Sequence, residues 1–362
     1  MYSYSENISP VFSKNNVTVV FSTDNKFVPY LGVAIKSLVD NCSGENNYDI
    51  VVLHSKVDEY NQKRLKTFEQ KNVSIRFYDM TDAMAQYKEH WYVHWGWSDS
   101  VYYRFFIPQI MSDYDKVIFV DGDVIINCDI SEWYNIDIEN NYLGGVQDIS
   151  QQMSGYSGEY YRENVLHIER EKYINAGVLS LNIPKLKQIH FTELCIETLK
   201  ELKNPVFQDQ DVINYVCQGH IKYIPHCYNL LWNCIHFFKD AESRMKEETY
   251  HEYKEGWKTP KIIHYAGAYK PWKQPWLAYS EYFWKYARET VFYEEIIYKN
   301  TKIQPMNRDV IKNAVYRHRI YLQYLRCKFM KALTFGKTKE HYQEKVKKLK
   351  LQVMDYRNTL KR

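Results

Sequence analysis

The sequence predicts an α/β protein with a central, mostly parallel sheet covered by helices, followed by a basic amphipathic helical tail. Three observations support this fold class. Short apolar runs alternate with helical patterns over the first 120 residues, as expected for parallel strands buried on both faces. Of the 362 residues, 45% are hydrophobic, enough for a large core. Composition then changes sharply after about residue 300.

The first half of the chain alternates strands and helices. Pro29 to Val39 has apolar residues at 3–4 spacing and a proline near the first turn, which indicates a helix. Asp58 is suited to cap the next helix. In order, we expect strands at 17–21, 49–53, 73–78 and 116–120, and helices at 29–39, 58–69 and 99–111.

The second half is less regular. We expect strands at 142–147, 173–181 and 221–224, helices at 183–202 and 209–218, and loops with a short helix over the charged segment 233–258. These elements assign residues 1–300 to one domain and residues 301–362 to a separate tail.

The tail is strongly basic, with 17 Lys and Arg against 4 Asp and Glu from Lys302 onward, whereas the body is acidic. Apolar residues recur at 3–4 spacing after Asn307, which is the pattern of a helix lying on an anionic membrane surface. The stripe comprises Ile311, Val315, His318, Leu322, Leu325, Phe329 and Leu333. A helix packed on the body or a coiled-coil partner is the alternative.

Composition also restricts the compartment and the partners. The seven cysteines show neither a disulfide framework nor paired metal-ligand spacing. The N-terminus lacks the charged and apolar regions of a signal peptide, and no run of about 20 apolar residues is present. We therefore expect a cytoplasmic protein, peripheral on the inner face of the membrane. Nucleic-acid binding fits poorly, because the basic surplus is confined to an amphipathic tail.

Asp121-Gly122-Asp123 closes the apolar strand expected at 116–120. Alternate side chains of an extended strand share a face, so both carboxylates can point the same way. Two carboxylates at a strand end suit Mg²⁺ or Mn²⁺, which bind carboxylates together with substrate phosphates. A solvated turn is the alternative. No Gly-x-Gly-x-x-Gly follows the first strand, which disfavours dinucleotide binding.

Five further motifs accompany this pair over about residues 17–284, and none of the six is specific alone. The six are Val20-Phe-Ser-Thr-Asp24 with Tyr30-Leu31, Tyr103-Arg104-Phe105, Val120-Asp-Gly-Asp123, Asn175-Ala-Gly-Val178, Phe207-Gln-Asp-Gln-Asp-Val-Ile-Asn214 and His264-Tyr-Ala-Gly-Ala-Tyr-Lys-Pro-Trp272. Together and in this order they resemble the retaining nucleotide-sugar glycosyltransferases of family 8. That family includes bacterial lipopolysaccharide and lipooligosaccharide galactosyl- and glucosyltransferases and, more distantly, glycogenin.

The resemblance implies a GT-A type, Rossmann-like domain that binds a UDP-sugar through a divalent cation. It implies Asp121, Asp123 and His264 as metal ligands, and this mixed set suits Mn²⁺ better than Mg²⁺. Lys270 would add positive charge at the diphosphate, and Gly267 would allow close backbone approach. A core histidine at a strand end is the alternative for His264.

The same resemblance implies further donor contacts, from Ser22, Asp24, Arg104, Asp121, Gly122, Asn175 and Ala176, with Gly177 giving room. Asp24 would hold the uracil ring and Arg104 would bridge the sugar and phosphate. Their alternatives are a cap for the first helix and a solvated arginine. For catalysis, Gln210 would lie below the anomeric carbon, Asp209 would bind sugar hydroxyls, and Asp148 would face the sugar or acceptor. Asp209 could also cap its own helix.

We therefore expect a metal-dependent retaining hexosyltransferase of bacterial surface polysaccharide synthesis. It would move glucose or galactose from UDP-glucose or UDP-galactose to a glycan or lipid-linked oligosaccharide. Because an amide oxygen is a poor nucleophile, substitution on one face of an oxocarbenium-like sugar is favoured over a covalent intermediate. A metal-dependent nucleotide-sugar hydrolase and a non-catalytic sugar- or membrane-binding protein are the alternatives.

Overall fold

The computed structural model describes residues 7–87, 98–155, 158–202, 205–231, 240–301, 322–334 and 336–359. The chain divides into two compact units, residues 1–300 and residues 301–362.

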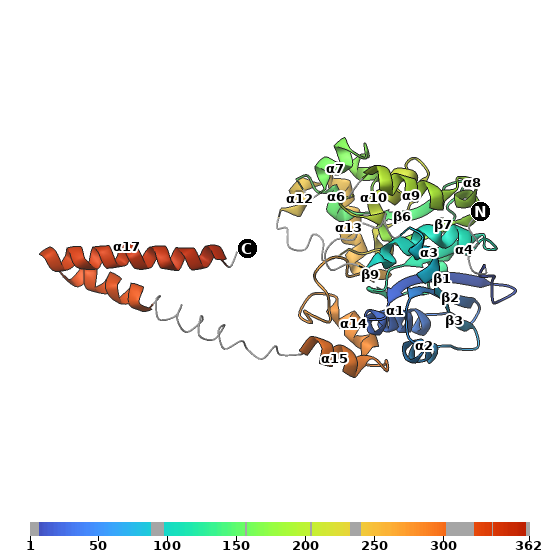
Figure 1. Cartoon of the computed structure of the whole chain (residues 1–362), viewed down its shortest axis with the longest axis horizontal. Helices are drawn as coiled ribbons and strands as arrows, with labels where there is room; N and C mark the ends of the chain where they lie inside the picture. Colours follow the sequence, from blue (N-terminus) through green and yellow to red (C-terminus); the bar gives the residue numbers. More distant parts are fainter. Residues whose placement is uncertain are drawn as a thin grey trace. The chain divides into compact units, whose positions relative to one another are not determined.

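A seven-stranded sheet forms the centre of the first unit (Figure 1). Its order is β3-β2-β1-β4-β7-β6-β8. The strands are β1 (Asn16–Asp24), β2 (Asn47–Ser55), β3 (Val73–Asp79), β4 (Lys116–Val120), β6 (Leu143–Gln147), β7 (Ile174–Asn182) and β8 (Ile221–Tyr223). Strands β3, β2, β1 and β4 are parallel, whereas β7 runs antiparallel to β4 and β6. The prediction of a mostly parallel α/β sheet is confirmed.

Apolar residues fill both faces of this sheet, because alternate side chains of a strand point to opposite sides. On one face, Val19 and Ile50 join a core formed with α1 (Val28–Asp40) and α14 (Ser280–Ala287). On the other face, Val20 and Val51 join a core formed with the 3₁₀ helix η2 (Asp99–Phe106) and with α9 (Phe191–Leu202). Burial on both faces explains why the strands read as continuous apolar runs.

The remaining elements of this unit connect or cover the sheet. They are α2 (Glu59–Lys66), α3 (Thr81–Ala85), α4 (Ile107–Ile110), α5 (Ser131–Tyr134), α6 (Ile149–Gln152), α7 (Glu159–Asn164), η3 (Arg170–Lys172), α8 (Ile183–Gln188), α10 (Asp209–Val216), η4 (His226–Tyr228), α12 (Ala241–Arg244), α13 (Glu247–Lys258) and α15 (Tyr293–Thr301). As predicted, Asp58 caps α2 by accepting a hydrogen bond from the Asn61 amide.

Three expectations about helices were wrong. The helix predicted over 99–111 is a 3₁₀ segment followed by one turn of α-helix, η2 and α4. The helix predicted over 183–202 is broken into α8 and α9, because His190 between them has a left-handed φ of 53°. The segment 233–258 contains a helix of 12 residues, α13, where only loops and a short helix were expected.

A second, two-stranded sheet pairs β5 (Val124–Ile126) with β9 (Ile262–His264), and it was not predicted. Each strand has only three residues, too short to give a clear periodic signal. Its register places Val124 opposite His264. It thereby brings His264 beside the segment that carries Asp121 and Asp123.

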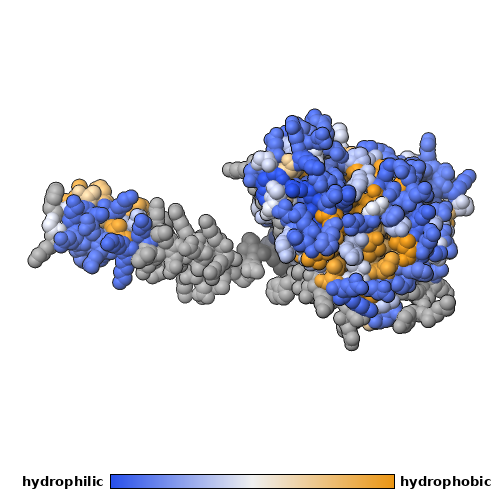
Figure 2. Space-filling view, turned by 90° about the horizontal axis from the view of Figure 1, so that it is seen from above, coloured by the Kyte–Doolittle hydropathy of each residue, from blue (hydrophilic) through white to orange (hydrophobic). Residues whose placement is uncertain are grey.

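In the second unit, a helix over residues 322–333 is followed by α17 (Gly336–Thr359). The apolar residues of the predicted stripe that are described here are exposed, and Figure 2 shows hydrophobic residues among hydrophilic ones in this unit. They are Leu322, Leu325, Phe329 and Leu333. The predicted positions Ile311, Val315 and His318 lie outside the described residues. Among the helices described, none has the length and apolar character needed to cross a membrane.

Candidate active site

The candidate site lies where β1 and β4 end side by side. These parallel strands are in register at Phe21 and Val120, so their carboxyl ends meet at one edge of the sheet. Asp121 follows β4 directly, and its backbone N–H donates to the Gly177 carbonyl of β7 at 2.8 Å. Ligands of open α/β sheets bind at such an edge.

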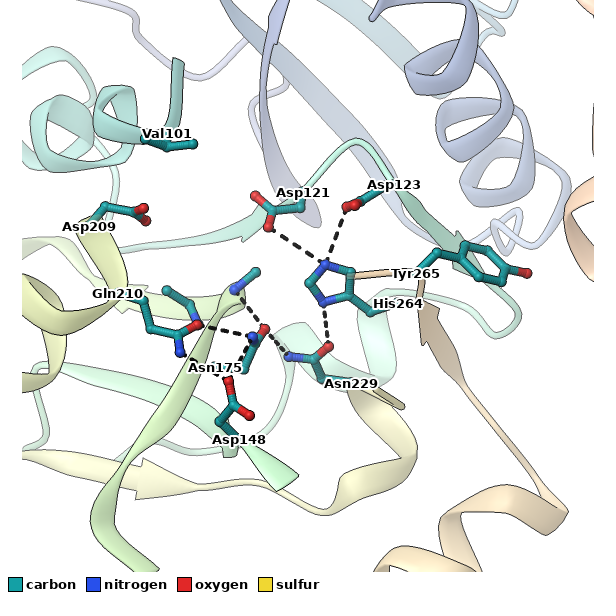
Figure 3. A network of polar contacts seen from close by, with 12 residues as sticks. Val101, Asp121, Asp123, Asp148, Asn175, Asp209, Gln210, Asn229, His264 and Tyr265 are labelled. Carbon is teal, nitrogen blue, oxygen red and sulfur yellow. Dashed lines mark hydrogen bonds and ion pairs between the residues drawn. The ribbon is translucent and has the colours of Figure 1, made fainter. Parts of the chain in front are cut away.

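Three predicted residues converge into one cluster (Figure 3). His264 Nε2 lies 3.2 Å from Asp123 Oδ1 and 3.7 Å from Asp121 Oδ2. One ligand atom from each residue lies within 4.8 Å of the other two. The structure thus brings together two carboxylates and an imidazole that the chain separates by about 140 residues.

Gly177 provides the space for this cluster. A Cβ atom added at Gly177 would overlap His264 Cε1 and lie 2.7 Å from Asp121 Oδ2. Any larger residue would therefore push the histidine and the aspartate apart. Gly177 was expected to give room for the donor sugar, whereas the space at its Cβ position is taken here by His264 and Asp121.

Cations hold the second oxygen of each carboxylate. Arg104 Nη2 lies 2.8 Å from Asp121 Oδ1, and Lys270 Nζ donates to Asp123 Oδ2. Burial raises the pKa of Asp121 even though Arg104 opposes the shift. Burial also disfavours the Asp123 anion, but Lys270 and His264 outweigh it and hold the pKa of Asp123 below its usual range. The free oxygens and Nε2 point at one another, which is a donor set that fits a divalent cation.

Arg104 connects the cluster of Asp121, Asp123 and His264 to α10. It is buried, it lies over the ring of Phe119, and its Nε is 3.1 Å from Asp209 Oδ2. It also donates to the carbonyl oxygen of Ala176. The alternative of a solvated arginine is therefore wrong.

Asp209 is the first residue of α10, and its carboxylate pairs with Arg104. It does not cap the helix, because Gln208 occupies the N-cap position and no side-chain cap bond forms. Burial raises the pKa of Asp209 to about 7, with Arg104 opposing and Asp121 reinforcing the shift.

Gln210, the second residue of α10, is held by hydrogen bonds at both ends of its amide. Its Oε1 accepts from Asn175 Nδ2 at 3.0 Å and from the Ala176 backbone N–H at 3.1 Å. Its Nε2 donates to Asp148 Oδ2 at 3.0 Å. Asp148 also caps α6 by accepting from Ser150. The structure therefore joins the half-buried Gln210 to the buried residues Asn175, Ala176 and Asp148 in one network beside the cluster. Figure 3 shows Gln210, Asn175 and Asp148 side by side.

Asn229 belongs to the same network and was not predicted. Its Oδ1 lies 2.9 Å from His264 Nδ1, and its Nδ2 donates to Asn175 Oδ1 at 2.9 Å. A bridge between Leu230 and Ile263 sets Asn229 beside β9. Its position therefore depends on a non-local contact, and no spacing in the sequence signals it.

Four predicted donor-binding residues lie around the site without hydrogen bonds to the cluster among the residues described. Asp24 Oδ1 accepts from the backbone N–H groups of Lys26 and Phe27, both at 2.9 Å, so it orders the turn before α1. Ser22 lies in β1 next to this turn. Gly122 packs against Phe27, and Gly267 has φ +78° with open space around its Cβ position. Only glycine adopts a left-handed φ without steric cost, so the backbone conformation alone favours glycine at position 267.

Comparison with known proteins identifies the family whose sequence pattern this chain matches. The model of Glycosyl transferase family 8 matches residues 18–275, as the six motifs predict. A putative glycosyltransferase of Haemophilus influenzae is 27% identical over 217 residues, covering 59% of this chain and 63% of the relative. The lipopolysaccharide 1,2-glucosyltransferase of Escherichia coli K12 is 27% identical over 281 residues, covering 75% of this chain and 78% of the relative.

Solved structures show the same fold. The bifunctional glycosyltransferase WbbM superposes with a TM-score of 0.72 at 29% identity, over 81% of this chain and 53% of WbbM. The galactosyltransferase LgtC, solved with donor and acceptor sugar analogues, superposes with a TM-score of 0.63 at 22% identity, over 76% of this chain and 96% of LgtC. The chain thus spans little more than half of WbbM and 63% of the Haemophilus relative.

Proposed function

The chain belongs to glycosyl transferase family 8, and from this premise we propose that it transfers glucose or galactose from a UDP-sugar to a glycan or glycolipid acceptor, with retention, in bacterial surface polysaccharide synthesis. The observation that carries the proposal is the convergence of Asp121, Asp123 and His264 next to the Gln210 network. Relatives named as lipopolysaccharide glucosyl- and galactosyltransferases support the acceptor class.

Two carboxylates and an imidazole would hold Mn²⁺, or Mg²⁺ more weakly, because imidazole is a better ligand for the transition metal. A cation bound there would act as a Lewis acid that neutralises the diphosphate. Lys270 lies at the same cluster and would add a second positive charge where the leaving diphosphate develops charge. Ser22, Asp24, Gly122 and Gly267 would contact the nucleotide.

Gln210 would face the anomeric carbon and stabilise positive charge on the sugar. Its amide oxygen is held by Asn175 and by the Ala176 N–H, so it is oriented before the donor binds. The leaving diphosphate would accept the proton of the attacking hydroxyl on the same face. Asp209 and Asp148 would bind hydroxyl groups of the sugar or acceptor.

Donor hydrolysis by the full-length protein tests this function. We expect UDP release from UDP-glucose or UDP-galactose with Mn²⁺, less with Mg²⁺, and none with EDTA. Asp121→Asn and Asp123→Asn should each lose at least about 100-fold in kcat, the size of an electrostatic contribution to catalysis. Asp82→Asn is the matched control, since Asp82 is exposed on α3, and its rate should be unchanged.

The stereochemistry of the sugar product gives a second result from the same reaction. Proton NMR at early times should show the α-anomer, which retains the configuration of the donor. Full turnover in EDTA would refute the metal dependence, and an early β-anomer would refute retention.

The hydrolase alternative lacks comparable support. Two-metal hydrolases need a second set of ligands about 4 Å from the first. Within the described ranges, Asp121, Asp123 and His264 are the sole group of three or more His, Cys, Asp or Glu placed to hold a metal.

For the tail, we propose that it attracts the enzyme to an anionic membrane on the cytoplasmic side. Its described apolar stripe is exposed, and Arg326 and several lysines lie in the same unit. Exposed apolar side chains with many cations favour an interface of lipid headgroups and acyl chains.

A further inference from the structure

A continuous line of side-chain amide groups, two of them buried, connects Gln210 to His264 (Figure 3). Gln210 bonds to Asn175, Asn175 to Asn229, and Asn229 to His264, with distances of 3.0, 2.9 and 2.9 Å. Asn175, Asn229 and His264 are each less than a tenth exposed. Because bulk water is largely excluded, each polar atom depends on its neighbour in this line.

The direction of these hydrogen bonds is set by two backbone N–H groups that cannot act as acceptors. The Ala176 N–H donates to Gln210 Oε1, and the Gly177 N–H donates to Asn175 Oδ1. Each side-chain amide must therefore present its oxygen at that position and its NH₂ group on the other side. With Asn175 Oδ1 fixed as an acceptor, Asn229 has to donate to it through Nδ2.

This leaves the oxygen of Asn229 facing His264 Nδ1, so Nδ1 must carry the proton. The tautomer with its proton on Nδ1 offers Nε2 as the metal ligand, and Nε2 is the atom that faces Asp121 and Asp123. We propose that Asn229 is a positioning residue that fixes this tautomer of His264 before any metal binds. Through Asn175 it also couples the orientation of His264 to that of Gln210.

The metal and catalytic consequences rest on the proposed function, whereas the tautomer does not. A metal ligand held by an outer hydrogen bond loses about 10- to 100-fold in metal affinity when that bond is removed. Loss of Asn229 should therefore weaken metal binding. It should also disturb Gln210, because the Asn175 Oδ1 atom loses one of its two hydrogen-bond donors and Asn175 is then less firmly oriented toward Gln210.

The first measurement uses the metal-free wild-type protein labelled with ¹⁵N-histidine. Long-range ¹H–¹⁵N correlation distinguishes a protonated from an unprotonated ring nitrogen. His264 is assigned by the loss of its signal in His264→Gln. We expect a proton on Nδ1, and an unprotonated Nδ1 would overturn the proposal whatever the variants do.

The second measurement compares two variants by titration with Mn²⁺. Asn229→Ser removes both contacts and should weaken Mn²⁺ binding about 10- to 100-fold. Asn229→Asp still accepts from His264 Nδ1–H, so its Mn²⁺ affinity should stay within a few-fold of wild type. Its second oxygen would face the Asn175 oxygen without a proton between them. We therefore expect kcat at saturating Mn²⁺ to fall about 10-fold, the equivalent of one hydrogen bond.

Asn41→Ser is the matched control, because Asn41 donates to Ser37, Ile126 and Tyr286 away from the cluster. It should lose stability without a change in Mn²⁺ affinity. Wild-type Mn²⁺ affinity in Asn229→Ser would overturn the positioning role, and wild-type kcat in Asn229→Asp would overturn the coupling to Gln210. If the wild-type protein does not bind Mn²⁺, the metal-dependent function is refuted. The NMR measurement of the His264 tautomer then still tests whether Asn229 positions the histidine.

Discussion

At Gly177, the absence of a Cβ atom leaves room for the cluster of Asp121, Asp123 and His264. The Cβ position there is occupied by the ring of His264 and approached by Asp121. A glycine inside a nine-residue strand costs backbone entropy and removes a packing side chain. Gly177 therefore lowers the stability of β7 but leaves space for the side chains of the cluster.

We predict that Gly177→Ala loses on the order of 100-fold in metal-dependent activity while the protein remains folded, because displaced ligands lose their geometry. Mn²⁺ titration and donor hydrolysis measure the loss. Gly44→Ala is the control, since no atom lies within 4 Å of its Cβ position. Normal Mn²⁺ binding by Gly177→Ala would show that the cluster tolerates the shift.

His226 gives the fold a specific sensitivity to acid. Burial lowers its pKa to about 4, and among the described residues its Nε2 has no hydrogen-bond partner. A histidine in the unfolded chain titrates near 6.5. Between these values the unfolded state binds a proton that the folded state does not, so stability falls as the pH falls from about 6.5 to 4.

From pH 7 to pH 5, we expect His226 to lower the free energy of unfolding by about 2 kcal/mol. His226→Phe keeps a ring against Tyr253 and should remove that part of the loss. Urea unfolding at both pH values measures it, and His251→Gln, at an exposed position, serves as the control. An equal loss in His226→Phe and wild type would assign the acid sensitivity to other groups.

At the scale of elements, α15 and the segment before it pack against α1 and α2. The ring of Phe292 fills the space above Gly32 of α1, where a Cβ atom would overlap it. Arg64 of α2 lies 4.0 Å from the centre of the same ring and pairs with Glu295 at 2.7 Å. These contacts make residues up to about 300 part of the first unit, although the family match ends at 275.

Phe292→Ala should therefore lower the free energy of unfolding by about 3–5 kcal/mol, the usual cost of removing a buried phenylalanine. The neighbouring Val291 is 55% exposed, and Val291→Ala should have an effect below about 0.5 kcal/mol. Urea midpoints of the two variants give the comparison. Similar midpoints would mean that the ring of Phe292 contributes little to the stability of the fold.

At the scale of the whole molecule, charge is divided unequally between the two units. The basic surplus of the tail belongs to residues 301–362, and every proposed donor contact lies between Ser22 and Lys270. Donor binding and membrane attraction are therefore proposed to reside in separate units. A truncation between the units separates the two properties.

A chain ending at Thr301 should hydrolyse the donor like the full chain but should no longer sediment with anionic vesicles. Each Lys or Arg near such a surface contributes about 1 kcal/mol, and this attraction is screened over roughly 10 Å at 0.1 M salt. High salt should therefore release the full-length protein, and neutral vesicles should not bind it. Equal sedimentation of the truncated chain would show that the tail has another role, such as packing or dimerisation.

The sequence by itself determined the features that local chemistry controls. Continuous apolar runs identified the strands, and Asp58 marked the start of α2. Six motifs in order identified the family, and with it Asp121, Asp123, His264 and Gln210 as a group. These signals are local, because each depends on residue type and spacing within a few positions.

Only the tertiary structure decided how these groups are oriented. The antiparallel direction of β7, the β5–β9 pair and the position of Asn229 all depend on contacts between distant segments. The same holds for Arg104, whose burial between Asp121 and Asp209 no local pattern indicates. Hydrogen-bond direction is likewise a property of the assembled network. It is set here by two backbone N–H groups of β7: the Gly177 N–H bonds locally to Asn175, and the Ala176 N–H reaches Gln210 only after α10 has packed beside the strand.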